Sequence, residues 1–429
     1  MPRIVFMGAG SVEFTKNLLS DLLSMEFADS ATIVLHDIDA ERLETATAMA
    51  RWMVDKLGRG TRIESRTDRR AAVEGADYVI NEIAVGGFNA TKTDFDVPAR
   101  FGVRQTIADT LGIGGIFRAL RTIPVMVSLG QDLAELAPSS MLINYTNPMS
   151  MIPRAVYEGS PFKRVVGVCH SVRDTQARLA NLVGVPVEEV AFQTAGVNHQ
   201  AFVLRFEHRG ENLYPRLDEV IEADPELQRT VRVAVYKAFG HFPTESSEHG
   251  SEYLPWFLHR DDQIAQHRIP VGVYLEWSQE NLDTYDEAKR ALAAGEGVEI
   301  EPTSELASEI IHSIETGTPR VLHANLRNDG LITNLPADAC VEVPCLVDRA
   351  GVQPTRIGDM PAQLAALNRT FLNVSELTLK AALEGRRDHV YHAAMLDPNT
   401  AATLSLTEIR QLVDAMIEAH GDLMPAGIR

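Results

Sequence analysis

The sequence predicts an α/β fold with an N-terminal, doubly wound parallel sheet and a C-terminal α+β part. Over about the first 170 residues, short apolar runs alternate with helical patterns, which is typical of parallel strands joined by right-handed crossovers. The predicted strands are 4–7, 32–37, 77–84, 141–146 and 165–169, with helices at 40–57 and 118–136. Beyond residue 172, helices at 175–182, 225–239, 304–316, 361–383 and 406–419 mix with strands at 191–196 and 340–347. The length favours more than one core, so we expect domains at residues 1–171 and 172–429.

The first strand runs directly into Gly8-Ala9-Gly10-Ser11 and then into a helix. Gly8 would permit a tight turn and Gly10 a close approach of a pyrophosphate, while the helix N-terminus, beginning at Ser11, supplies N–H groups. Asp37 ends the second strand, where such Rossmann-type folds hold an adenosine ribose. Glu13 replaces the third glycine of the fingerprint, so the prediction rests on the order of elements. They predict a site for a dinucleotide, and the alternative is a strand–turn–helix without a ligand.

The charge and composition argue against several classes of protein. The formal net charge is −19, from 40 basic and 59 acidic residues, and such a surface repels nucleic acid and anionic lipid. The sequence shows no apolar run as long as a membrane span and no signal peptide at its start. Its three cysteines fit a reducing cytoplasm better than a disulfide framework. We therefore expect a cytoplasmic protein that acts on a small molecule.

Two short segments combine residues that bind transition metals. Cys169-His170 ends a predicted strand and Asn198-His199 follows another. A thiolate and an imidazole converging on one cleft would hold a divalent metal. Taken alone, a buried cysteine and a core histidine are the simpler interpretation. Cys340 and Cys345 are expected to be buried apolar residues of a strand.

Two further segments are rich in polar groups or glycine. Residues 106–115 contain Asp109 and several glycines, which fit either a substrate loop or a structural loop. Residues 244–257 combine acids, hydroxyls, a histidine and aromatic rings, as a sugar site does. A solvated helix start capped by Thr244 or Ser246 is the alternative. Polar turns at 327–330 and 334–336 would line the same cleft or merely connect strands.

Together these segments resemble glycoside hydrolase family 4, the NAD- and manganese-dependent glycosidases. The matching residues are Gly8-Ala9-Gly10-Ser11, Ala108-Asp109-Thr110, Asn147-Pro148-Met149, Cys169-His170-Ser171, Gly196-Val197-Asn198-His199, Asn334-Leu335-Pro336, Val341-Glu342-Val343-Pro344 and Asp397-Pro398. Three blocks, 105–112, 244–249 and 390–395, resemble the bacterial α-galactosidase (melibiase) branch. The resemblance implies a fold like that of lactate and malate dehydrogenases, and a homodimer or homotetramer.

The resemblance also implies an unusual hydrolysis of terminal α-galactosides such as melibiose. NAD⁺ takes hydride from C3 of the sugar, and Mn²⁺ bound across O2 and O3 stabilises the negative charge left when the C2 proton is removed. Elimination at C1, addition of water and return of the hydride complete the cycle. NAD is therefore regenerated in each turnover.

Site residues carry over from the family one by one. Cys169 and His199 match the metal ligands, Asn147 and Asn198 are the substrate-binding candidates, and Asp109 matches an acid near the catalytic base. Tyr253 is the candidate base, with a pKa that a nearby Mn²⁺ would lower.

The candidate general acid of this chain differs from that of the phospho-glycosidases. Those enzymes carry an aspartate after the metal cysteine, whereas this chain has His170. His170 is therefore the candidate acid, with Glu248 as second choice, and a 6-phosphorylated substrate is not expected.

Other functions remain open at this stage. Within the family, the alternatives are an α-glucosidase and an α-galacturonidase. Outside it, an NAD-dependent hydroxy-acid dehydrogenase would need an arginine for the carboxylate and a His–Asp relay, and no such ordered set is found. A non-catalytic NAD-binding sensor would leave the metal pair without a role.

Overall fold

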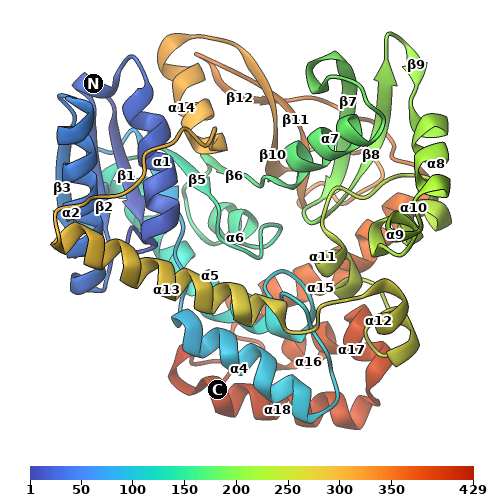
Figure 1. Cartoon of the computed structure of the whole chain (residues 1–429). Coiled ribbons are helices and arrows are strands. Elements are labelled where there is room, and N and C mark those ends of the chain that lie inside the picture. Colours follow the sequence, from blue (N-terminus) through green and yellow to red (C-terminus); the bar gives the residue numbers. More distant parts are fainter.

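The first six strands form a parallel sheet at the left of Figure 1. The computed structural model describes residues 1–429. The strands lie in the order β3-β2-β1-β4-β5-β6, with every neighbouring pair parallel. They are β1 (Arg3–Met7), β2 (Thr32–His36), β3 (Arg62–Arg66), β4 (Tyr78–Asn81), β5 (Met141–Asn144) and β6 (Val165–Gly167). This is the strand order of dinucleotide-binding folds, and it confirms the predicted fold class.

The remaining strands are antiparallel and continue the same twelve-stranded sheet. They are β7 (Val190–Val197), β8 (Gln200–His208), β9 (Glu211–Asn212), β10 (Arg320–Arg327), β11 (Cys340–Asp348) and β12 (Gly351–Pro354). A bridge between Asn325 and Gly167 joins β10 to β6, and one between Glu342 and Gly196 joins β11 to β7. Asn198-His199 forms the turn between β7 and β8. The sheet therefore connects the strand that precedes Cys169 to the hairpin that carries His199.

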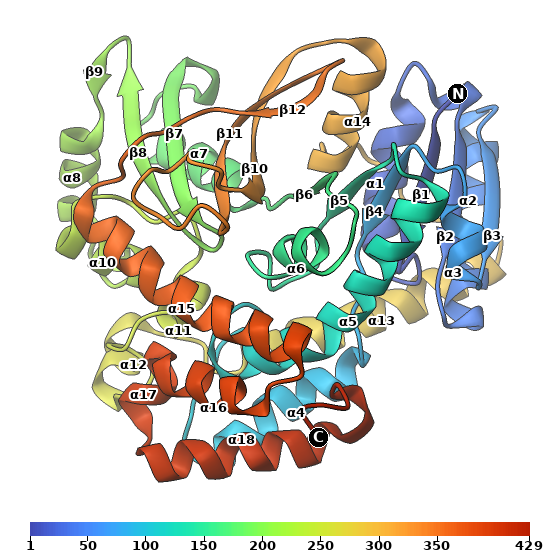
Figure 2. The ribbon, with the colours of Figure 1, turned by 180° about the vertical axis from the view of Figure 1, so that it is seen from behind.

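Helices cover the parallel strands and form a layer below the antiparallel ones (Figure 1). Those of the N-terminal half are α1 (Val12–Ser24), α2 (Ala40–Leu57), α3 (Arg69–Val73), α4 (Gly87–Arg100), α5 (Gly112–Leu136), α6 (Ile152–Gly159) and α7 (Ser171–Leu182). Figure 2 shows α15 (Ala362–Glu384) running from the antiparallel strands toward α5, with α16 (Arg387–Leu396) and α18 (Leu406–His420) beneath. The others are α8 (Tyr214–Ala223), α9 (Pro225–Gln228), α10 (Val231–Phe239), α11 (Ser247–Glu252), α12 (Asp261–His267), α13 (Val273–Ala293), α14 (Leu306–Thr316) and α17 (Pro398–Thr403), with 3₁₀ turns at Ala28–Ser30, Val187–Glu189 and Gly421–Leu423.

Helix α5 is the centre of the main core. By length and composition alone it would be able to cross a membrane, but 72% of its most apolar stretch is buried inside the protein. It packs against α4, α6 and α15. We therefore interpret its apolar character as that of a core helix.

Two predicted helices differ clearly from the structure, and one long helix is absent from the prediction. The helix predicted at 225–239 is two helices, because Thr230 leaves the helical conformation and caps α10 through the N–H of Val233. Helix α5 begins at Gly112, six residues before the predicted start at Arg118. The long helix α13 was not predicted, because none of its residues is fully buried and its apolar stripe is weak. The predicted domain boundary falls at the start of α7 and stays a prediction.

Candidate active site

The turn between β1 and α1 is shaped by its two glycines. Gly8 has φ of +93°, and a Cβ there would lie 3.0 Å from the backbone of Ile83. A Cβ on Gly10 would lie 2.6 Å from Oδ2 of Asp37. Instead, the Gly10 N–H donates to that oxygen at 2.8 Å. Gly8 is therefore required for the turn, as predicted, while Gly10 allows the carboxylate of Asp37 to approach the backbone.

Asp37 and its neighbour form a small surface suited to a nucleoside. Ile38 is 90% exposed directly after the fixed carboxylate. Arg42 donates to the carbonyl of Gly10 at 2.8 Å, and its guanidinium lies 4.2 Å above the ring of Tyr285 on α13. An apolar side chain beside a hydrogen-bond acceptor matches an adenine ring and its ribose. Ser11 is the exposed N-cap residue of α1.

The glycine-rich segment 106–115 is a loop packed tightly on the first turn of α5. A Cβ on Gly114 would lie 2.7 Å from Ala108, and one on Gly115 would lie 2.5 Å from the backbone of Thr110. The buried carboxylate of Glu252 accepts the N–H groups of Ile107 and Ala108 at 3.0 Å. The glycines therefore allow close packing, and the loop that they support presents Asp109 and Thr110.

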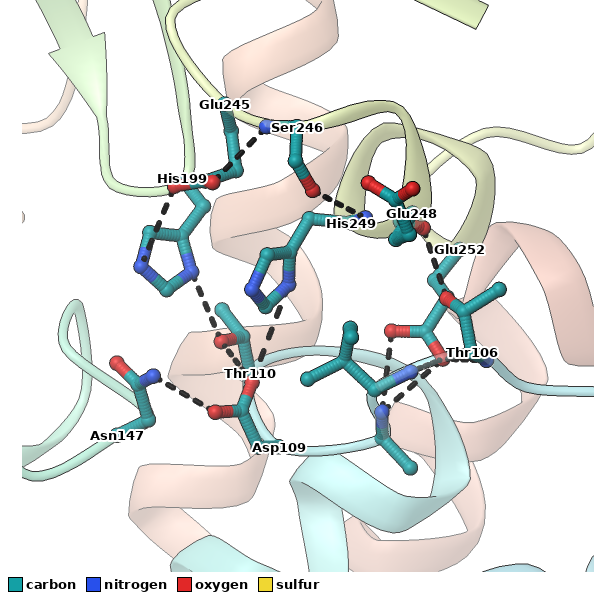
Figure 3. Close-up of polar contacts among 12 residues, drawn as sticks. Thr106, Asp109, Thr110, Asn147, His199, Glu245, Ser246, Glu248, His249 and Glu252 are labelled. Atoms are coloured by element: carbon teal, nitrogen blue, oxygen red, sulfur yellow. Dashed lines mark hydrogen bonds and ion pairs between the residues drawn. The ribbon is translucent and has the colours of Figure 1, made fainter. Parts of the chain in front are cut away.

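A chain of hydrogen bonds leads from this loop to His199 (Figure 3). Asn147 Nδ2 donates to Asp109 Oδ2 at 2.7 Å, and Thr110 Oγ1 donates to Asp109 Oδ1 at 2.6 Å. Thr110 Oγ1 also lies 3.0 Å from His199 Nδ1. Because the hydroxyl proton is directed at Asp109, the oxygen accepts the Nδ1 proton of the imidazole. This assignment leaves His199 Nε2 as the nitrogen that a metal would bind, in exchange for any proton on it.

The Nε2 side of His199 faces a thiol and a carboxylate. Ligand atoms of Cys169, His199 and Glu245 all lie within 4.8 Å of one another. His199 Nε2 is 3.5 Å from Glu245 Oε2. Burial would lower the pKa of His199, but the charges of Glu245 and Cys169 outweigh it and raise the pKa to about 10. Without a cation Nε2 therefore carries a proton, and a bound metal would take the place of that proton. Sulfur, nitrogen and oxygen donors on one side of an imidazole suit a divalent transition metal.

A second group around His199 is less suited to a cation. Asp109, His199 and His249 also come within 4.8 Å of one another. However, Nδ1 of His199 is already engaged by Thr110, and His249 Nδ1 accepts the hydroxyl of Tyr253 at 2.6 Å. Burial opposes ionisation of Asp109, yet the charges of His249 and Arg118 hold its pKa below the ordinary value. We therefore interpret this group as a hydrogen-bonded network beside the metal ligands.

Tyr253 lies at the centre of this network. Its side chain is 2% exposed, and its hydroxyl also lies 3.4 Å from His199 Nδ1. Burial, together with the charge of Asp109, raises the pKa of Tyr253 well above its ordinary value. A role as a base therefore depends on a cation that would offset these effects.

The three other predicted residues have different surroundings. His170 Nε2 donates to Glu305 at 2.8 Å, a hydrogen bond that raises the pKa of this 40% exposed imidazole. Asn198 is fully buried and donates to Glu342 at 3.2 Å. The carboxylate of Glu248 belongs to neither of the two groups of potential metal ligands around His199. The structure thus gathers Asp109, Asn147, Cys169, His199 and Tyr253, and their roles stay predictions.

Sequence reasoning assigned no role to Thr110, Glu245, His249 or Glu252. The polar segment 244–249 was noticed as a possible sugar site, but its spacing does not tell which side chain faces His199. No sequence signal marks Glu252 as the acceptor for the loop at 106–108.

Comparison with known proteins identifies the family. The chain matches the Family 4 glycosyl hydrolase over residues 3–185 and the Family 4 glycosyl hydrolase C-terminal domain over residues 194–400. An α-galactosidase of Bacillus subtilis (strain 168) is 40% identical, with 99% of both chains covered. An α-galactosidase of Rhizobium meliloti (strain 1021) is 35% identical, with 99% of this chain and 89% of the relative covered.

A solved structure extends the likeness to the whole fold. The crystal structure of a 6-phospho-α-glucosidase from gut microorganisms, in complex with NAD and Mn²⁺, has a TM-score of 0.82 at 19% identity, with 99% of each chain covered. The family matches, together with the two α-galactosidases, confirm the predicted resemblance. The chain belongs to family 4 of the glycosyl hydrolases.

Proposed function

We propose that this protein is an NAD- and Mn²⁺-dependent α-galactosidase. The observation that carries the proposal is the similarity, along the whole chain, to two α-galactosidases at 40% and 35% identity. The site is compatible with it, because a dinucleotide turn and a cluster of metal-binding side chains occur in one protein. A terminal α-galactoside is the expected substrate.

The residues present fit both cofactors. For NAD, the Gly8 turn, the fixed carboxylate of Asp37 and the exposed Ile38 offer a backbone cradle, a ribose acceptor and an apolar face for adenine. For Mn²⁺, the Cys169 thiol and the Nε2 of His199 offer a soft and an intermediate donor. When bound, NAD⁺ would supply a hydride acceptor for the sugar, and Mn²⁺ would supply a Lewis acid that makes the C2 proton next to the resulting carbonyl group acidic.

Side chains of the protein transfer the C2 proton and bind the sugar. Tyr253 Oη passes its phenolic proton to His249 Nδ1, 2.6 Å away, and the phenolate oxygen then takes the C2 proton. Asn147 and Asp109 bind the sugar hydroxyls, since both belong to the hydrogen-bond chain that ends at His199.

The leaving oxygen also needs a proton. His170 follows Cys169 directly, and the hydrogen bond to Glu305 keeps it protonated to higher pH than a free imidazole. We therefore propose His170 as the proton donor to the glycosidic oxygen.

The proposed cellular location follows from the chemistry of the metal ligands. A metal-binding thiol must remain reduced, which supports a cytoplasmic location. The predicted homodimer or homotetramer stays a prediction that sedimentation would test.

The test is hydrolysis of p-nitrophenyl α-galactoside with NAD⁺, Mn²⁺ and a thiol, then with each omitted. We expect activity to require all three and NADH not to accumulate. Parallel assays with the α-glucoside and the α-galacturonide rank the family alternatives, and stoichiometric NADH would indicate a dehydrogenase. Full activity after removal of nucleotide and treatment with EDTA would refute the proposal. In D₂O, galactose labelled at C2 is expected, because the C2 proton leaves and returns.

A further inference from the structure

We propose that Glu245 is a third protein ligand of the metal, alongside Cys169 and His199. This inference rests on the metal site of the proposed function. It goes beyond the predicted thiolate–imidazole pair, because it adds a negatively charged oxygen donor from a different segment of the chain.

The distances place Glu245 within reach of the same cation. Its Oε2 lies 3.5 Å from His199 Nε2, and one ligand atom each of Glu245, His199 and Cys169 lie within 4.8 Å of one another. Neighbouring ligands around a small octahedral cation, each at about 2.1 Å, are about 3 Å apart. A small shift of either side chain would therefore let one ion contact both atoms.

The carboxylate is held in this orientation by its own segment. Glu245 Oε1 accepts the N–H of Ser246 at 2.9 Å, which leaves Oε2 directed at His199 (Figure 3). Ser246 in turn caps α11 by accepting the N–H of His249 at 3.3 Å. Because the start of a helix fixes the carboxylate, little side-chain freedom would be lost when a metal binds.

The charge of the site also favours this role. The Glu245 side chain is only 12% exposed, and a buried carboxylate is costly without a cation or hydrogen-bond donors. Thiolate and carboxylate together would neutralise the two charges of Mn²⁺ and leave positions open for sugar oxygens. A carboxylate oxygen also suits Mn²⁺ better than a soft thiolate does. The metal would thus be held before the sugar arrives.

The first experiment measures Mn²⁺ affinity without sugar, from the EPR signal of the free ion. For Glu245→Gln we expect the Mn²⁺ affinity to fall at least about 10-fold, because even the replacement of residues that only hydrogen-bond to metal ligands lowers metal affinity that much. Glu248→Gln, in the same segment but outside the ligand group, should bind Mn²⁺ as the wild type does. An unchanged NAD affinity checks that both variants are folded.

The second experiment distinguishes a direct ligand from a neighbour that only orients His199. Wild-type protein labelled with ¹³C at the glutamate carboxylates is loaded with Mn²⁺ and studied by electron–nuclear double resonance. We expect a strong ¹³C coupling to the metal that remains in Glu248→Gln and vanishes in Glu245→Gln. The wild-type spectrum decides the question even if Glu245→Gln does not fold.

The outcomes separate the two proposals. Normal Mn²⁺ binding in Glu245→Gln, or a wild-type spectrum without ¹³C coupling, would overturn the role of Glu245 and leave the α-galactosidase proposal standing. A wild-type protein that binds no Mn²⁺ would overturn the metal site itself, and the role of Glu245 with it.

Discussion

The dinucleotide turn and the metal cluster are built in opposite ways. The turn and its acid come from one strand–helix–strand unit, in which the Gly8 N–H donates to the carbonyl of His36 and the Gly10 N–H donates to the carboxylate of Asp37. The cluster takes Cys169 from beyond β6, His199 from the β7–β8 turn and Glu245 from before α11. Thr110, which orients His199, comes from a loop. A site built from neighbouring residues is therefore visible in the sequence as a motif, whereas a site built from distant segments depends on the packing of those segments.

The strongest test of the assembled site is Cys169→Ser. A serine hydroxyl is a far weaker ligand for a soft metal than a thiolate. We expect bound Mn²⁺ to be lost, and activity to fall about 10³-fold or more, as expected when several kcal/mol of metal stabilisation disappear. Metal analysis and initial rates measure this. Cys340→Ser, at a buried strand position, should retain its metal, and a Cys169→Ser enzyme with full manganese content would contradict the assignment.

The stability of the part of the fold around the metal cluster should also be more sensitive to acid than that of the part around the dinucleotide turn. Burial lowers the pKa of His323, on β10 in the pocket that Cys169 lines, from 6.5 to about 4. Protonation therefore favours the unfolded chain: the contribution to stability is complete above pH 6.5 and is lost as pH falls toward 4, by up to about 3 kcal/mol.

Urea unfolding at pH 7 and pH 4.5 measures this effect. His323→Gln should flatten the pH dependence, whereas the exposed His392→Gln should follow the wild type. Equal pH slopes for His323→Gln and wild type would rule out this cause.

The local site should respond independently of the metal. Asp37→Ala removes the acceptor for the Gly10 N–H and the expected acceptor for the ribose. We expect NAD binding to weaken about 10-fold, the value of one charged hydrogen bond, with Mn²⁺ affinity unchanged. Titration calorimetry measures both. Asp39→Ala, which removes the N-cap of α2, should lower stability and spare NAD affinity. Loss of Mn²⁺ binding in Asp37→Ala would mean that the two sites are not separate.

The smallest expected effect is that of Glu252→Gln. The glutamine side chain keeps one oxygen that accepts the N–H groups of residues 106–108, but its NH₂ group is itself a donor and would face those N–H groups without an acceptor. We expect a loss of about 1 kcal/mol in stability, together with a lower kcat, because the loop carries Asp109 and Thr110. NAD affinity should not change. An unchanged kcat in a destabilised protein would confine Glu252 to a structural role.

The same contrast explains what the sequence could predict. Periodic apolar residues and glycines are local, so the parallel sheet, the glycine turn and Asp37 were predicted from the residues themselves. Cys169 and His199 were considered as a metal pair from their residue types, but only the resemblance favoured that hypothesis over a buried cysteine and a core histidine, because no spacing links them. Glu245 and Thr110 required the structure, since their orientation depends on the helix cap at Ser246 and on the packing of the loop against Gly114 and Gly115.

Helix α13 has a consequence for how the protein is made. Gly272, the residue before α13, donates its N–H to the carbonyl of Gln105 at 2.8 Å, next to the loop at 106–115. Farther along the helix, Tyr285 stacks on Arg42 beside the glycine turn. These contacts join residues that are far apart in the chain, and such contacts form slowly. During synthesis the N-terminal half emerges first. It must therefore wait for most of the polypeptide to leave the ribosome before the side of its nucleotide turn is covered.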